Sequence, residues 1–173
     1  MNLKSIIANR ELKAKLVSVT RKKKVFNLDS ASSIGILWEY DQQGTFLSLD
    51  KELRNMGIET SSLCYFPNKN AVIPRGIIGF TRKQLSWTEI PKSEDANSFL
   101  HKKFDILIDL TGQKYFPIVY LTALSSAAFK IGHSNEPENY LDLNIEFENH
   151  PEASHLVEEI LYFLKRINKT AIE

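Results

Sequence analysis

The sequence predicts an α/β protein with a three-layer, Rossmann-like architecture, in which a mostly parallel sheet carries helices on both faces. Short apolar runs, typical of strands that are covered on both sides, alternate along the chain with segments of helical periodicity. This alternation favours a parallel sheet between two layers of helices. A basic segment without Pro or Gly precedes the first strand, and it predicts an extra N-terminal helix.

The length and composition are those of one ordinary globular domain. The 173 residues can bury a core without disulfides, and the only cysteine, Cys64, falls in a predicted strand, where a buried structural role is expected. The first residues lack the apolar stretch of a signal peptide, and the longest apolar run, residues 117–128, is too short to cross a bilayer. We therefore expect a cytoplasmic protein without a transmembrane segment.

Charge divides the chain into a basic N-terminal arm, residues 1–24, and a single Rossmann-like domain, residues 25–173. The arm holds eight Lys or Arg and one acid, whereas the rest holds 14 bases and 20 acids. Such an arm suits nucleic acid or a membrane surface, or it docks against the acidic body of this chain or of a partner. The bases do not line one helix face, so docking is favoured over nucleic-acid binding.

The arm is predicted to be helical over residues 3–20. One side is interrupted by Arg10, and the opposite side is also apolar, so the helix is only weakly amphipathic. It can therefore touch two surfaces, which is compatible with a homo-oligomer formed through this helix. The first side comprises Leu3, Ile6, Ile7, Ala14 and Val17, and the second comprises Leu12, Leu16 and Val19.

The domain is predicted to begin with a βαβ unit. A strand over residues 33–40 leads to a helix that opens at Gly44 and Thr45 and ends at Gly57, before a second strand over residues 58–66. The later elements follow from similar patterns: a short strand at 77–80, a capping-box turn from Thr81 to Gln84, a helix from Ser93 to His101, strands at 104–110, 128–132 and 141–147, and a buried helix at 117–126.

A last helix is predicted to start at Pro151. Its inner face is expected to consist of Leu156, Ile160, Phe163, Leu164 and Ile167. Three basic residues, Lys165, Arg166 and Lys169, lie near its C-terminus, where positive charge is favourable.

The common catalytic and nucleotide-binding motifs are absent. No Gly-x-Gly-x-x-Gly follows the first strand, and there is no P-loop and no Gly-x-Ser-x-Gly. The spacing of His133, His150 and His155 matches no zinc site. The sequence therefore predicts no metal ion and no cofactor, and it leaves the catalytic residues unknown. Trp38 and Trp87 are expected to be buried or partly buried packing residues.

A site is expected at the carboxyl ends of the strands, where open α/β sheets bind ligands. We expect the first strand in the centre of the sheet, with the second strand on one side of it and the strand at 104–110 on the other. A topological switch then lies between the first strand and the strand at 104–110. Polar residues follow three strands there, and the candidate ligand-binding cleft consists of Glu39, Asp41, Asp109, Thr111, Gly112, His133 and Ser134.

Each member of this cleft also has a structural interpretation. Asp109 can cap the turn that follows its strand, Glu39 and Asp41 can be solvated loop acids, and His133 can be an ordinary surface histidine. Ser134 stands in a segment with good turn chemistry.

Segments along nearly the whole chain resemble a family of short uncharacterised proteins from the Bacteroidota. The similarity is carried by Phe104–Leu110, Ala123–Ser134, Thr81–Trp87 and Tyr140–Ile145, and it implies a bacterial cytosolic protein without an established activity. Asp105, Asp109 and Lys130–Gly132 are also similar to the N-terminal domain of heptosyltransferase-like glycosyltransferases. In those enzymes the donor binds largely in a second domain, which we do not expect in a chain of 173 residues.

Three hypotheses follow for the function. The leading one is a non-catalytic or regulatory binding protein that engages a small molecule or a protein partner. The second is an enzyme that acts on a sugar or nucleotide near Asp109 and His133. The third is nucleic-acid or membrane-surface binding through the basic helix, which would depend steeply on salt.

Overall fold

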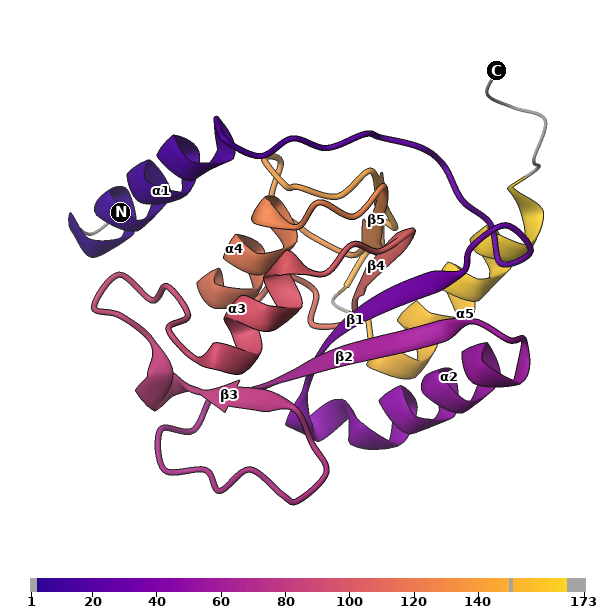
Figure 1. The fold of residues 1–173 in the computed structure, drawn as a ribbon, viewed down its shortest axis with the longest axis horizontal. Helices are drawn as coiled ribbons and strands as arrows, with labels where there is room; N and C mark the ends of the chain where they lie inside the picture. Colours follow the sequence, from indigo (N-terminus) through magenta and orange to yellow (C-terminus); the bar gives the residue numbers. More distant parts are fainter. Residues whose placement is uncertain (1–2, 150, 168–173) are drawn as a thin grey trace.

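The computed structural model describes residues 3–149 and 151–167, so His150 and Lys169 lie outside the described residues. Helices and short 3-10 turns alternate with strands along the chain (Figure 1). The elements are α1 (Leu3–Leu16), β1 (Ser33–Glu39), η1 (Tyr40–Gln42), α2 (Gln43–Asn55), β2 (Glu59–Phe66), β3 (Gly79–Thr81), η2 (Arg82–Gln84), α3 (Glu94–His101), β4 (Ile106–Asp109), α4 (Phe116–Leu124), β5 (Phe129–Gly132), β6 (Leu143–Asn144) and α5 (Ala153–Arg166).

The six strands form one parallel sheet in the order β3-β2-β1-β4-β5-β6. β1 is central, β2 lies on one side of it and β4 on the other, which confirms the predicted threading. The chain therefore leaves β1 in one direction and returns to it from the other. The switch point between β1 and β4 lies where the sequence places it, and the carboxyl ends of all strands share one edge.

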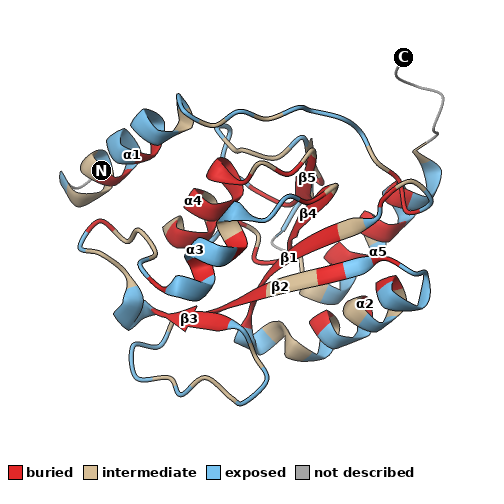
Figure 2. Ribbon diagram, viewed as in Figure 1, coloured by how far each residue is buried: buried red, intermediate tan, exposed pale blue. Residues whose placement is uncertain are grey.

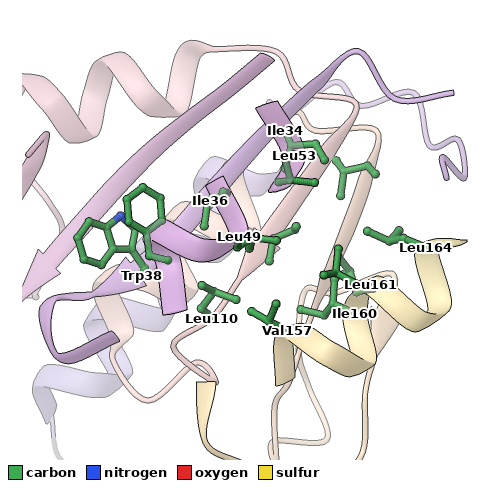
Figure 3. Close-up of a cluster of buried hydrophobic side chains, with 14 of the residues drawn as sticks. Ile34, Ile36, Trp38, Leu49, Leu53, Leu110, Val157, Ile160, Leu161 and Leu164 are labelled. Atoms are coloured by element: carbon green, nitrogen blue, oxygen red, sulfur yellow. The ribbon is translucent and has the colours of Figure 1, made fainter. Parts of the chain in front are cut away.

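The helices cover both faces of the sheet and complete the three layers (Figure 2). On one face, α2 and α5 enclose the larger core with alternate residues of β1, β4 and β5, as Figure 3 shows for Ile34, Ile36, Leu49 and Ile160. On the other face, α3 and α4 cover Leu37, Leu63 and Leu107. Because strand side chains alternate between faces, neighbouring residues in a strand belong to different cores.

Helix α1 packs against the outer side of α4, through the second of its two predicted sides. Leu12 is fully buried and contacts Tyr120, Ala123 and Leu124. Residues of the first side, Leu3, Ile6 and Val17, are exposed instead. The arm thus docks on its own domain, and the expectation of a homo-oligomer through this helix stays a prediction.

Several boundaries and orientations differ from the sequence predictions. Helix α1 ends at Leu16 rather than at residue 20, and the last three strands are shorter than predicted because loops continue their apolar runs. Trp87 is 65% exposed, so its expected burial is wrong. Phe163 also faces solvent, whereas Val157 and Leu161 occupy the inner face of α5 beside Leu164. Trp38 and Cys64 are buried, as predicted.

No membrane-spanning helix is present in the part of the chain that the structure describes, since each helix is too short or too polar to cross a bilayer.

Candidate functional site

Glu39, the last residue of β1, lies at the switch point and is bound by a tyrosine from the loop after β4. The hydroxyl of Tyr115 donates to Oε1 of Glu39 at 2.8 Å. Glu39 is buried, and burial raises the pKa of its carboxyl above the usual range, although the hydrogen bond from Tyr115 opposes this effect. Glu39 is therefore an anchored carboxylate rather than the solvated loop acid of the structural interpretation.

Asp109, at the end of β4, is completely buried and closes the turn that follows it. Its Oδ1 accepts hydrogen bonds from the backbone N–H of Thr111 at 2.9 Å and from the Thr111 hydroxyl at 2.8 Å. Its Oδ2 faces the hydroxyl of Thr122 in α4, at 3.4 Å. Burial raises the pKa of Asp109 to about 6, against the opposing effect of the Thr111 hydrogen bonds. This geometry matches the capping interpretation of Asp109.

The loop between β4 and α4 reverses direction through two residues with left-handed backbone. Gly112 has φ +65° and Gln113 has φ +53°, a conformation that glycine adopts without steric cost. The turn seals Asp109 beneath the loop and carries Lys114 and Tyr115 to the edge of the sheet.

His133 follows β5 and points to the opposite side of the sheet from Asp109. The ring nitrogen Nδ1 is 2.8 Å from the carbonyl oxygen of Ile145. The ring meets Phe147 edge-on at 5.4 Å between centroids, and Phe147 in turn contacts His155 of α5. His133 is 1% exposed, so the interpretation as a surface histidine is wrong.

Ser134 serves to join β5 to β6. Its backbone N–H donates to Oδ1 of Asn144 at 2.8 Å, and the Asn144 amide donates back to the Ser134 carbonyl at 2.9 Å. The Ser134 hydroxyl accepts the N–H of Glu136 at 3.2 Å, which makes a local turn. The Ser134 backbone thus holds the edge strand β6 through the Asn144 side chain, while the Ser134 hydroxyl is engaged in the turn.

Two cavities open at the carboxyl edge, and Lys114 lines both. The larger, about 410 Å³, lies between the end of β1 and the start of α5, and the smaller, about 200 Å³, lies between β2 and the start of α4. Neither is lined by Asp109 or His133. Asp41, Gln42, Thr45, Lys114, Pro151, Glu152, Ala153 and Ser154 line the larger cavity, and Tyr65, Pro67, Arg82, Glu89, Lys114, Tyr115, Phe116 and Pro117 line the smaller.

The structure therefore brings together only part of the predicted cleft. Glu39 and Asp41 lie beside the cavities, whereas Asp109, Thr111 and Ser134 are occupied in turns and His133 faces another core. Sequence reasoning missed Lys114, Tyr115 and the start of α5. The topology offers a signal for α5, because helices that follow parallel strands begin at this same edge.

A buried lysine in β5, Lys130, was also missed as a titratable group. It is 2% exposed, and its Nζ donates to the carbonyl of Ala123 in α4 at 3.0 Å. Burial lowers the pKa of Lys130 to about 7, and the nearby positive charge of Arg21 acts in the same direction. The amine is enclosed between β5 and α4, away from both cavities.

Several basic residues of the arm form ion pairs or hydrogen bonds with the domain of the same chain. Arg21 pairs with Asp142 and also donates to the carbonyls of Ala127 and Ala128, while Lys23 lies 3.4 Å from Asp142. Burial tends to raise the pKa of Asp142, but the hydrogen bonds from Arg21 and the Lys130 N–H outweigh it and lower the pKa. These contacts favour the docking interpretation over a nucleic-acid footprint.

Two more contacts along α1 extend this docking. Lys4 pairs with Glu89 at 2.8 Å, and Lys15 donates to the Tyr120 hydroxyl at 2.7 Å. Within residues 3–149 and 151–167, no three His, Cys, Asp or Glu side chains gather in a way that could hold a metal ion.

Comparison with known proteins gives a family without assigning an activity. No functionally curated protein matches the chain. The model of a family of unknown function (DUF6913) matches residues 4–167, which include the basic helix α1 as well as the whole sheet. Because the match extends over nearly the entire length, the chain belongs to this family of unknown function.

Proposed function

We propose that this protein is a non-catalytic binding protein, which holds a small, hydroxyl-bearing ligand such as a sugar or the ribose of a nucleotide. The ligand would occupy the larger cavity at the carboxyl edge. The observation that carries this proposal is the lining of that cavity, where Asp41, Glu152 and Lys114 surround a space of about 410 Å³. A volume of this size suits a small ligand.

The donors and acceptors of the lining match a polyhydroxylated ligand. The carboxylates of Asp41 and Glu152 accept hydrogen bonds from hydroxyl groups, as acidic residues do for ribose in dinucleotide-binding folds. Lys114 and Thr45 supply donors. Glu152, the residue that precedes α5, makes no side-chain hydrogen bond to the first turn. Ala153 and Ser154 of that turn line the cavity, so their N–H groups are further donors.

The burial of the two strongest catalytic candidates favours binding over catalysis. Asp109 is fully enclosed, and His133 faces the core beneath α5. An enzyme that acts on a sugar or nucleotide, in keeping with the similarity to heptosyltransferase-like proteins, is the alternative.

The proposal includes a bacterial, cytosolic setting. Fractionation of cells, with an antibody against the protein to detect it, tests this setting.

Binding can be measured with glucose, ribose, ADP and UDP-glucose as probes, each by ligand-observed NMR and calorimetry. We expect at least one probe to bind, and we expect Asp41→Asn and Lys114→Gln each to weaken it about tenfold, the cost of one or two lost polar contacts. The matched controls are Asp29→Asn and Lys51→Gln, which change exposed residues elsewhere. If no probe binds, or if the controls weaken binding as much, the proposal is wrong.

The enzyme alternative has a separate readout. UDP-glucose or ADP turned over by the protein, with the turnover lost in Asp109→Asn, would replace the binding proposal with a catalytic one. Binding without turnover supports a non-catalytic role.

A further inference from the structure

We propose that the open edge of β2 binds an extended peptide segment of a partner, which adds a strand to the sheet in a slot between α2 and α3. This site is distinct from the cavities at the carboxyl edge. It does not rest on the proposed function.

The edge is open because β3 is short. β3 pairs only with Cys64–Phe66, so the preceding residues of β2, from Glu59 to Leu63, have a strand on one side only. The chain before β3 does not fill the gap, since it turns at Gly76, where φ is +89°, and Ile77 donates to the Pro74 carbonyl. In Figure 1 this part of β2 lies beside α2 and extends past the point where β3 begins.

The backbone of β2 presents unpaired groups along this edge. Glu59 donates its N–H to Ser32 on the β1 side at 2.9 Å, and Cys64 donates to Ile78 on the β3 side at 3.0 Å. Main-chain groups alternate in direction along a parallel strand, so the N–H and C=O of Thr60 and Ser62 face the open side. The Thr60 carbonyl receives a long contact from Arg54 at 3.5 Å, whereas Ser62 lies where β3 has not yet begun.

The slot beside this edge has walls on both sides of the sheet plane. It forms a cavity of about 420 Å³ with Thr60–Ser62 as its floor. One wall is Phe46 and Arg54 of α2, and the other is Phe99 and Lys102 of α3. An extended chain sends alternate side chains to opposite faces, so it would place them against both walls.

Trp38 supplies a second, independent indication of a ligand. Its indole lines the same cavity and is stacked on Phe46 with 4.2 Å between ring centroids. The side chain is 1% exposed, yet its Nε1 has no hydrogen-bond partner. A buried donor without a partner costs about 1–3 kcal/mol. Because Nε1 is itself buried, an acceptor on the occupant removes this cost only when the side chains that cover the indole move aside. Figure 3 shows Trp38 at the end of the core remote from Leu164.

The charges around the slot favour a peptide over a small anion or cation. Arg54 is paired with Asp50 at 2.8 Å, and Lys102 donates to the Ser61 hydroxyl at 3.2 Å, so neither sign of charge dominates. Charged side chains at a strand edge also discourage unselective pairing. A specific peptide must displace Arg54 from the Thr60 carbonyl and compensate with its own backbone hydrogen bonds.

The probe is a random peptide library displayed on phage, selected against the full chain, with the selected peptide then synthesised. Trp87→Phe leaves Trp38 as the single tryptophan, because the chain has two. We expect the peptide to change the fluorescence emission of Trp38 in the Trp87→Phe variant. In the native protein we expect it to slow amide hydrogen exchange at Ser62. This exchange measurement needs no disruptive variant.

Ser62→Pro and Ser62→Ala make the matched pair. Proline removes the outward N–H, and it is tolerated on an edge because the β1 ladder does not use that group. We expect Ser62→Pro to weaken the peptide about tenfold and Ser62→Ala to retain it, as one lost backbone hydrogen bond implies. An absence of selected peptides, equal binding by both variants, or a peptide that leaves Trp38 and the Ser62 amide unchanged would overturn the proposal.

Discussion

Asp109 ends β4 and His133 directly follows β5, one residue out of register with Asp109, so the two side chains point to opposite faces of the sheet. Asp109 is paired with Gly132, so His133 stands one position further along β5. Asp109 reaches Thr122 of α4 on one face, and His133 reaches Phe147, beside α5, on the other. Although Asp109 and His133 follow neighbouring strands, their side chains therefore do not line a common site. The buried Asp109 has its own consequence for stability.

Asp109→Asn should change how stability depends on pH. Burial raises the pKa of Asp109 from its ordinary value of 3.8 to about 6 in the folded protein. The folded state therefore binds the proton more tightly, and the stabilisation by protonated Asp109, complete below pH 3.8, is lost as pH rises to about 6. Asparagine stays neutral and keeps an acceptor for Thr111. Its advantage over the native protein should grow by up to about 3 kcal/mol between pH 3.8 and 7.

Urea unfolding of both proteins at several pH values measures this difference. Taking the difference between the two proteins cancels the other titrating groups. A constant difference across the range would show that Asp109 does not titrate there, and a change in the opposite direction would contradict the raised pKa.

Lys130→Met tests the buried amine in β5. Burial lowers the pKa of Lys130 from 10.5 to about 7, so above pH 7 the unfolded chain binds more protons than the folded one. The native protein should therefore gain stability as pH rises from 7 toward 10. Methionine has a similar length and no charge, so the variant should be more stable near pH 7 and should lack this rise. Thermal unfolding at pH 7 and 9 checks both statements, and a parallel rise in the two proteins would contradict them.

The sequence patterns predicted the sheet because they depend on long-range averages. Apolar runs and helix periodicity set the order of elements, and with them the central place of β1 and the switch point beside it. The burial of Trp38 followed from the apolar run around it. The start of a helix at Ser93 followed from a local rule instead, and the Ser93 hydroxyl accepts the N–H of Ala96 at 3.2 Å.

The site was harder to predict because one residue of register decides which face a side chain meets. Nothing local in the sequence tells that Asp109 points toward α4 and His133 toward α5. Lys130 was overlooked since a lysine in a short strand is ordinarily taken to reach solvent, and here α4 covers it. Trp87 stays exposed because its segment is a surface turn, in which Glu89 donates to the Ser86 carbonyl.

Gly132→Ala should destabilise the protein by about 1–3 kcal/mol, the usual cost of overpacking. A Cβ at Gly132 would lie 2.8 Å from the backbone oxygen of Asp109, and a backbone atom in a central strand cannot move aside easily. Gly44→Ala is the matched control, since a Cβ there meets nothing within 4 Å and alanine favours the helix. Unfolding in urea should show opposite signs for the two variants, and equal stability of Gly132→Ala and the native protein would contradict this packing.

Leu12→Ala tests whether α1 is part of the folded domain. Leu12 is fully buried against Tyr120 and Leu124 of α4, so its truncation removes apolar contacts and leaves a cavity. We expect a loss of about 2–3 kcal/mol in the free energy of unfolding. Val17, which follows α1 and is 90% exposed, provides the matched control, and Val17→Ala should change stability by less than about 0.5 kcal/mol. Urea unfolding followed by circular dichroism measures both.

The arm is also held to the domain by the ion pair between Arg21 and Asp142. The double variant Leu12→Ala and Arg21→Ala should therefore release the arm, so that protease cleaves within residues 1–24 while the sheet stays folded. Protection of the arm in the double variant would show that other contacts hold α1 in place.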